Sequence, residues 1–224
     1  MMIERNILII DDEEETEISI EAYREIFSIL KRDLDLNYTL RFYWEKSIAD
    51  AKEILNEKKI NFDCLLIDYD FPNEEVPQKG IHLVKKIRES INKRCKIVFY
   101  TMHAPHELSE LEFIELINND IFRFVPKDGD VLSLSYKNIG FNKSDQLIVE
   151  ALIDALNDVN PVSIALENFL INYKNSSENI VLNIDGEEYT IIEVLNSIRL
   201  YENPGNKFVR NLLEMSIIDY LEMK

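Results

Sequence analysis

Short, continuous apolar runs alternate with amphipathic stretches over the first 127 residues, and this alternation constrains the fold more than any other feature. The runs Asn6–Ile10, Cys64–Ile67 and Ile97–Tyr100 have the length of strands and almost no polar residues, which is typical of strands buried on both faces. Weaker runs occur at Tyr38–Tyr43 and Phe122–Val125. Five strands separated by helices predict a doubly wound α/β fold with a five-stranded parallel sheet.

Apolar residues at helical spacing separate these strands. The inner faces of the first three expected helices carry Ile18, Tyr23, Ile26, Phe27 and Leu30; Ile48, Ala51, Ile54 and Leu55; and Ile81, Leu83, Val84 and Ile87. Ser47 is placed to cap the second helix, which should end near Lys58, and a fourth covers residues 108–117. In such a fold, ligands bind outside the carboxyl ends of the strands, where the strand order reverses.

Polar residues stand at those carboxyl ends. In chain order they are Asp11 and Asp12 after the first strand, Asp68 and Asp70 after the third, Thr101 after the fourth and Lys127 after the fifth. Carboxylates about 4 Å apart repel by roughly 1–4 kcal/mol per pair, so their convergence requires a cation. Mg²⁺ fits such a site, because it prefers oxygen ligands, takes only one or two carboxylates and keeps several waters.

The same residues suit transfer of a phosphoryl group to a carboxylate. Asp68 would attack in line, Mg²⁺ and Lys127 would hold the phosphoryl oxygens, and Thr101 would donate to one of them. Each residue alone is more simply a turn, capping or solvated residue. Their placement at four strand ends favours the phosphoryl-transfer site.

At these positions the sequence resembles the receiver domain of bacterial two-component systems. The resemblance covers roughly residues 7–127 and rests on the segments Ile7–Glu13, Leu65–Pro72, Gly80–Arg88, Ile97–Thr101 and Phe124–Lys127. It implies a flavodoxin-like receiver fold, a sensor histidine kinase or phosphotransfer protein as partner, and Mg²⁺ as cofactor.

The resemblance also implies roles for single residues. Asp68 would be the phosphoacceptor, and Asp11 and Asp12 would belong to the metal site together with Asp68 and the backbone carbonyl of Asp70. Thr101 would be the switch hydroxyl and Lys127 the lysine that contacts the phosphoryl group. Phe124 falls where the family carries its rotating aromatic residue, and a plain core aromatic is the alternative for it.

Several positions depart from the family pattern. Pro126 precedes Lys127, whereas the family has lysine followed by proline, and the segment 73–79 is longer than usual and should form a protruding loop. Met102 replaces a small residue after the switch threonine, so we expect it to crowd the phosphoryl group and slow dephosphorylation. Asp70 and His103 occupy positions that tune phosphoryl lifetime in the family.

After Lys127 the βα alternation ends. The helix Ser144–Leu156, with Ser144 as N-cap, is the expected last helix of a receiver domain that covers residues 1–158. Val131–Tyr136, apolar at alternate positions, is an inserted strand or loop. Residues 159–224 should form a small, mostly helical module.

The module has clear boundary signals. Its expected elements are a helix from Pro161 to about Tyr173, a hairpin over residues 180–190 turned at Asp185–Gly186, a helix to about Tyr201 and a helix from Pro204 to Leu221. Thr190 and Glu193 have the spacing of a capping box. The apolar stripe from Phe208 to Leu221 is most simply a core face, with a docking or dimer helix as the alternative.

Charge argues against a nucleic-acid partner. The formal net charge is −17, and phosphate backbones repel an acidic chain. A helix-turn-helix output is disfavoured too, because the last helix sets only Lys207 and Arg210 against Glu214, Asp219 and Glu222. No apolar stretch approaches the roughly 20 residues of a membrane span, no signal peptide is evident, and the two cysteines have no metal spacing. We therefore expect a cytoplasmic location, with no membrane insertion.

Three functions follow. The first is a response regulator in which phosphorylation of Asp68 biases a two-state receiver, and the C-terminal module passes the change to a protein effector, with or without homodimer formation. The second is a pseudo-receiver that binds partners without phosphorylation. The third is a phosphatase like the haloacid-dehalogenase superfamily, which uses Asp68 and Asp70 as nucleophile and acid, although the motif there follows the first strand. Beyond the receiver chemistry itself, no enzyme is expected.

Overall fold

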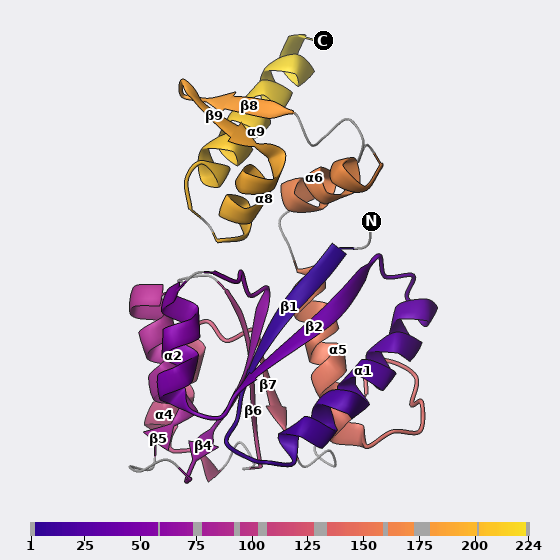
Figure 1. Cartoon of the computed structure of the whole chain (residues 1–224), viewed down its shortest axis with the longest axis vertical. Helices are drawn as coiled ribbons and strands as arrows, with labels where there is room; N and C mark the ends of the chain where they lie inside the picture. The colour runs from indigo at the N-terminus through magenta and orange to yellow at the C-terminus, as the bar shows by residue number, and fades with distance from the viewer. Residues whose placement is uncertain are drawn as a thin grey trace. The chain divides into compact units, whose positions relative to one another are not determined.

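The chain forms two compact units, residues 4–158 and residues 159–224. The computed structural model (Figure 1) describes residues 3–57, 59–73, 78–91, 95–102, 107–127, 134–158, 161–172, 180–200 and 202–222.

The first unit is built on a five-stranded sheet with the order β2-β1-β3-β6-β7. The strands are β1 (Ile3–Ile10), β2 (Tyr38–Glu45), β3 (Cys64–Asp68), β6 (Lys96–Thr101) and β7 (Arg123–Pro126). β1 pairs with β3, β3 with β6 and β6 with β7, all in parallel. The chain moves from β1 outward to β2 and then returns to the other side of β1, so the order reverses between β1 and β3. The predicted doubly wound fold is confirmed, and its switch point lies between these two strands.

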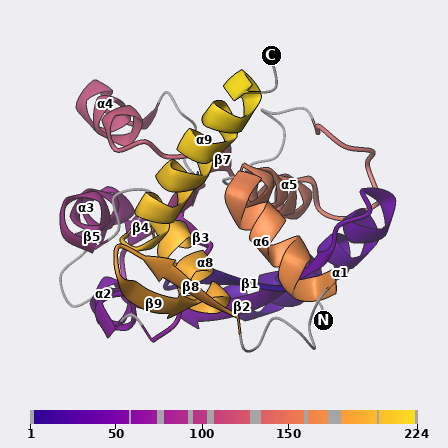
Figure 2. The same ribbon diagram turned by 90° about the horizontal axis from the view of Figure 1, so that it is seen from above.

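Helices cover both faces of this sheet (Figures 1 and 2). One face carries α1 (Thr16–Asp33) and α5 (Lys143–Asn157), and the other carries α2 (Ile48–Glu57), α3 (Gly80–Lys86) and α4 (Glu110–Asn118). A π-helical turn, Ile87–Ile91, continues α3. Within β1, Leu8 and Ile10 join the apolar cluster under α2 and α3, where Ile48 and Val84 also lie. The segments Ile7–Ile10 of β1 and Cys64–Ile67 of β3 are apolar throughout because both of their faces are buried.

The second unit consists of α6 (Pro161–Asn172), β8 (Val181–Ile184), β9 (Glu187–Thr190), α8 (Ile191–Arg199) and α9 (Gly205–Glu222). The hairpin turns at Asp185 and Gly186, whose φ angles of 56° and 90° suit a two-residue loop. The predicted capping box is confirmed: the Thr190 hydroxyl accepts from the backbone N–H of Glu193, whose carboxylate accepts from Thr190.

Some expected boundaries were wrong. Asn142, not Ser144, caps α5, because the Asn142 side-chain oxygen accepts the backbone N–H of Ser144 at 3.0 Å. The part of the 73–79 loop that is described is partly paired: β4 (Asp70–Phe71) and β5 (Gln78–Lys79) form an antiparallel pair that the sequence did not indicate. Residues 131–133 and His103 lie outside the described residues. Among the described helices, none combines the length and the apolar character that crossing a bilayer requires.

Gly80, the first residue of α3, packs against the end of β3. A Cβ atom at this position would lie 1.9 Å from the carbonyl oxygen of Asp68, and the Gly80 N–H donates to the carbonyl of Tyr69 at 2.7 Å. Only glycine permits this approach, so Gly80 determines where the backbone of Asp68 sits.

We expect Gly80→Ala to destabilise the unit by about 1–3 kcal/mol or more, because the backbone of Asp68 must shift to make room. Chemical denaturation followed by circular dichroism measures this. Gly140→Ala is the comparison variant, since a Cβ there meets nothing within 4 Å and only the positive φ of 88° is strained. Equal losses of stability in the two variants would refute the close approach at Gly80.

Candidate functional site

Three buried carboxylates meet at the switch point of the sheet. Asp11 and Asp12 follow β1, Asp68 ends β3, and one carboxylate oxygen from each lies within 4.8 Å of the others. Their exposed fractions are 1%, 8% and 5%. The structure thus brings together the three side chains that the sequence predicted for a metal site, at the carboxyl ends of the two strands that flank the reversal.

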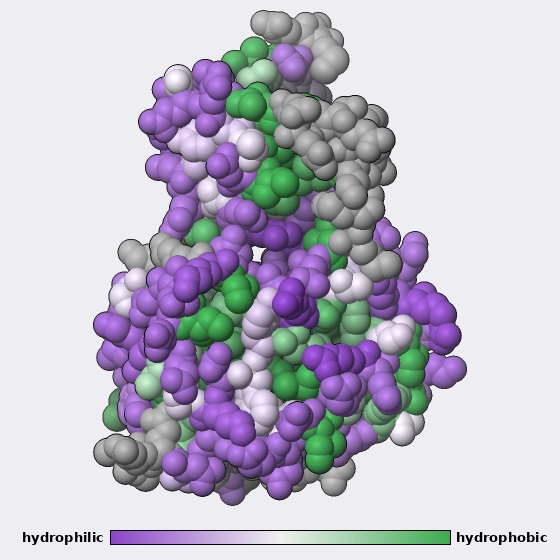
Figure 3. All heavy atoms as spheres, viewed as in Figure 1, coloured by the Kyte–Doolittle hydropathy of each residue, from purple (hydrophilic) through white to green (hydrophobic). Residues whose placement is uncertain are grey.

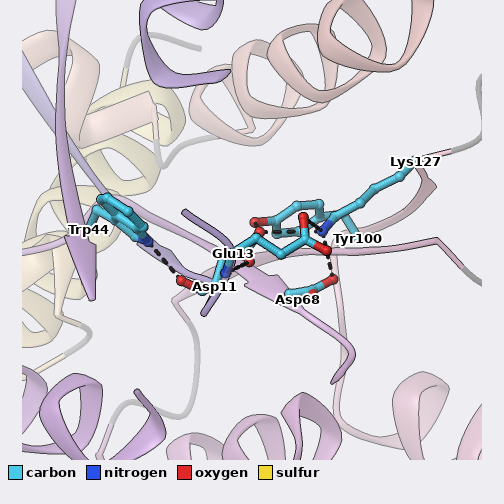
Figure 4. Close-up of polar contacts among 6 residues, drawn as sticks. All are labelled: Asp11, Glu13, Trp44, Asp68, Tyr100 and Lys127. Atoms are coloured by element: carbon cyan, nitrogen blue, oxygen red, sulfur yellow. Dashed lines mark hydrogen bonds and ion pairs between the residues drawn. The ribbon is translucent and has the colours of Figure 1, made fainter. Parts of the chain in front are cut away.

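Asp11 is held by a dense set of contacts (Figure 4). One carboxylate oxygen accepts the backbone N–H of Glu13 at 2.9 Å, and the other accepts a hydrogen bond from the Tyr100 hydroxyl. The indole N–H of Trp44 donates to the Asp11 carbonyl at 2.7 Å. The position of Asp11 is therefore set by β2 and β6 as well as by its own strand.

Asp12 has one satisfied and one unsatisfied carboxylate oxygen. Oδ2 accepts the backbone N–H of Asn73 at 2.8 Å. Oδ1 is buried and has no hydrogen-bond partner among the described residues. Leaving a charged acceptor unsatisfied costs several kcal/mol, so this oxygen fits a ligand that supplies positive charge.

Lys127, just after β7, is the cation that contacts this cluster. Its Nζ lies 3.3 Å from Asp68 Oδ1, 3.3 Å from Asp11 Oδ2 and 3.2 Å from Glu13 Oε2. Its backbone N–H donates to the carbonyl of Thr101 at 2.6 Å, which ties the lysine to the end of β6. Although Pro126 precedes this lysine instead of following it, the ammonium group reaches the carboxylates.

Burial and neighbouring charges shift the pKa values of Asp68 and Lys127. Burial raises the pKa of Asp68 to about 7, Lys127 lowers it in part, and Asp11 adds to the rise. For Lys127 burial acts in the opposite direction, yet the carboxylates of Asp68, Asp11 and Glu13 prevail and raise its pKa. One ammonium group does not offset all of the negative charge nearby.

The remaining predicted residues that the structure describes belong to β4, β6 and β7 or follow them directly. Thr101 is buried at the end of β6, beside Pro126 in register. Phe124 in β7 packs against Phe99, with ring centroids 6.1 Å apart, and is partly buried. Asp70 begins β4, and the side chain of Met102 is 64% exposed.

A second polar network begins at Tyr69, directly after Asp68. The Tyr69 hydroxyl donates to Glu112 of α4 at 2.9 Å, and Lys79 Nζ donates to the Tyr69 hydroxyl at 2.6 Å and to Glu112 at 2.5 Å. The hydrogen bonds from Lys79 and then from Ser109 lower the pKa of Glu112 to about 2. The network connects the end of β3 to the first turn of α4.

Sequence reasoning missed Tyr100, Glu13 and Tyr69. A buried phenol needs a hydrogen-bond partner, so Tyr100 beside Thr101 was a usable signal. Glu13 and Tyr69 carry no such signal, because their contacts depend on where Lys127 and Lys79 reach.

Several solved structures are similar to this chain. A receiver-domain protein from Clostridium thermocellum is 18% identical, with a TM-score of 0.43 over 68% of this chain and 94% of that one. The phosphorylated cyanobacterial phytochrome response regulator RcpA is 11% identical, with a TM-score of 0.45 over 69% of this chain and 95% of RcpA. The response regulator RcsB from Salmonella typhimurium is 15% identical, with a TM-score of 0.44 over 77% of this chain and 79% of RcsB. No family model and no curated protein matches.

The strand order of residues 4–158 decides the fold class. The fold is flavodoxin-like, of the receiver kind. The solved structures named above include receiver domains.

The titration of Asp68 leads to a stability prediction for the metal-free protein. Between pH 3.8 and about 7 the folded state binds a proton at Asp68 that the unfolded state has lost, so this group's contribution to stability falls as pH rises. We expect Asp68→Asn to stabilise the fold by on the order of 2 kcal/mol at pH 8 and by much less at pH 5.

Thermal unfolding in a chelator at the two pH values measures this difference. Asp33→Asn is the control, because that carboxylate is exposed and lies outside the cluster. An Asp68→Asn variant that is less stable than wild type at pH 8 would show that Lys127 fully compensates the burial of Asp68.

Proposed function

We propose that this chain is a response regulator, in which Asp68 accepts a phosphoryl group and residues 159–224 act as an output or docking module. One observation carries the proposal: the Lys127 ammonium group lies 3.3 Å from Asp68 Oδ1, at the edge of a buried cluster that also holds Asp11 and Asp12. The groups that we propose as nucleophile, phosphate-binding cation and metal ligands are thus neighbours.

The chemistry follows from these positions. A carboxylate oxygen of Asp68 attacks the phosphorus atom of a donor, the bond to the donor's leaving group breaks, and an acyl phosphate forms on Asp68. Lys127 neutralises charge on the transferred oxygens, and the Thr101 hydroxyl donates to one of them as the switch residue. Burial excludes bulk water from the new acyl phosphate.

A divalent cation fits the acidic cluster. Asp11, Asp12, Asp68 and the backbone carbonyl of Asp70 would hold Mg²⁺, and the unsatisfied Asp12 Oδ1 supports this assignment. When bound, the ion supplies the charge neutralisation that lets an anionic donor approach three carboxylates. Tyr100 and Trp44 keep Asp11 in position whether or not an ion is bound.

The partners follow from the same proposal. A sensor histidine kinase or phosphotransfer protein in the cytoplasm would supply the phosphoryl group, and a protein effector would read the switch. Phe124, next to Phe99 in the core, would respond to movement of Thr101. Asp70, Met102 and His103 would set the lifetime of the acyl phosphate.

Phosphorylation can be tested with a small phosphodonor. We expect incubation of the full chain with Mg²⁺ and acetyl phosphate to add one phosphoryl group, seen by intact mass, because Asp68 needs no partner protein for the transfer. Asp68→Ala should abolish the adduct, and Lys127→Met should slow its formation by about tenfold or more through lost charge stabilisation.

Asp50→Ala is the control, since this exposed carboxylate on α2 lies outside the cluster and should leave the adduct unchanged. An adduct that persists in Asp68→Ala would move the acceptor elsewhere. A wild-type chain that takes no phosphoryl group would favour the pseudo-receiver instead.

A further inference from the structure

From Leu212 onward, α9 exposes a large apolar surface. Seven of its large apolar residues are at least 40% exposed: Leu212, Leu213, Met215, Ile217, Ile218, Tyr220 and Leu221. Hydrophobic residues are visible at the surface beside the end of this helix in Figure 3. Contiguous apolar surface of this kind marks an interaction site more often than it occurs by chance.

Among the described residues of its own unit, α9 packs through one side. Phe208 and Val209 contact the cluster of Ile184, Val194 and Ile198. Gly205 lies so close to α8 that a Cβ atom would be 2.3 Å from the backbone nitrogen of Ile198. These contacts define the inner side of α9.

An exposed apolar stripe lies on a different side of α9 from the inner side. Leu213, Ile217, Tyr220 and Leu221, hereafter the α9 stripe, lie on average roughly 110° around the helix from the inner side. Their exposed fractions are 54%, 60%, 61% and 64%. Since Leu213, Ile217 and Tyr220 follow one another at steps of four and three residues, they have the spacing of a helix–helix seam.

The area of the stripe suits a weak dimer. Its four residues expose roughly 500 Å², so pairing with an identical stripe would bury on the order of 1,000 Å² in total, the lower limit for a specific interface. A second copy also provides an apolar seam of the same length and spacing.

The charges of α9 select the direction of pairing. Lys207 and Arg210 lie in the first half of the helix, whereas Glu214, Asp219 and Glu222 lie in the second. In parallel pairing, like charges of the two helices would lie at the same level, and Arg210 of one copy would face Arg210 of the other beside the stripe. Antiparallel pairing of the stripe avoids these like-charge contacts and lets the two helix dipoles offset one another.

We propose that the α9 stripe pairs with the α9 stripe of a second copy, in antiparallel orientation, to form a homodimer. The inference does not rest on phosphorylation of Asp68, because every residue that carries it lies in α9.

Sedimentation equilibrium of the full chain tests the proposal. We expect wild type to dimerise with a dissociation constant in the tens of micromolar, measured from about 5 to about 300 µM. Ile217→Glu should weaken dimerisation by about tenfold or more, because it places a charge in the seam. Met215→Glu is the matched control: it is 62% exposed, adds the same charge to the same helix, and lies outside the stripe.

Orientation is tested with a cysteine in place of Leu213. Antiparallel pairing about Ile217 keeps the two introduced thiols roughly 12 Å apart along the helix axes, so Leu213→Cys should form no disulfide-linked dimer under mild oxidation; parallel pairing places the two thiols at the same level and predicts one. Circular dichroism confirms that each variant is folded. A monomeric wild type, equal effects of Ile217→Glu and Met215→Glu, or a disulfide-linked dimer of Leu213→Cys would each overturn the proposal.

Discussion

Electrostatic imbalance at the carboxyl ends of β1 and β3 is the constraint around which residues 4–158 are organised. Asp11, Asp12 and Asp68 are buried together, and the ammonium group of Lys127 contacts two of them. Repulsion within the cluster raises the pKa of Asp68, and burial raises it more. A cluster of this kind is unfavourable for folding alone, so a cation that bound to it would gain binding energy from relief of the repulsion.

The fold maintains this arrangement through several elements. β1 and β3 are adjacent because the strand order reverses between them, and Gly80 allows α3 to start against the Asp68 carbonyl. Trp44 of β2 and Tyr100 of β6 hold Asp11 from both sides. On the other side of Asp68, the hydrogen bonds of Tyr69 with Lys79 and Glu112 connect the site to α4. A change at Asp68 therefore has a physical route to the surface helix.

Much of this was predictable from the sequence, for a physical reason. Strands buried on both faces leave continuous apolar runs, and a parallel sheet collects the residues that follow those runs at one edge, so Asp11, Asp12 and Asp68 could be placed together. The contacts of Tyr100 and Glu13 could not, because they depend on side-chain reach across strands distant in sequence. The β4–β5 pair was missed since two-residue strands have no periodicity. Asn142 was overlooked as the cap of α5 because Ser144 offers the same signal two residues later.

Metal binding at the cluster is the central claim, and Trp44 offers a direct measure of it. This is the only tryptophan in the chain, and its indole N–H donates to the Asp11 carbonyl at 2.7 Å. Titration of the full chain with Mg²⁺ should change its fluorescence saturably, and Asp12→Asn should weaken the response by about tenfold or more, because it removes the charge of the unsatisfied oxygen. Asp50→Asn should leave the titration unchanged. No saturable change in wild type, or the same titration curve in Asp12→Asn, would contradict a metal site formed by these three carboxylates.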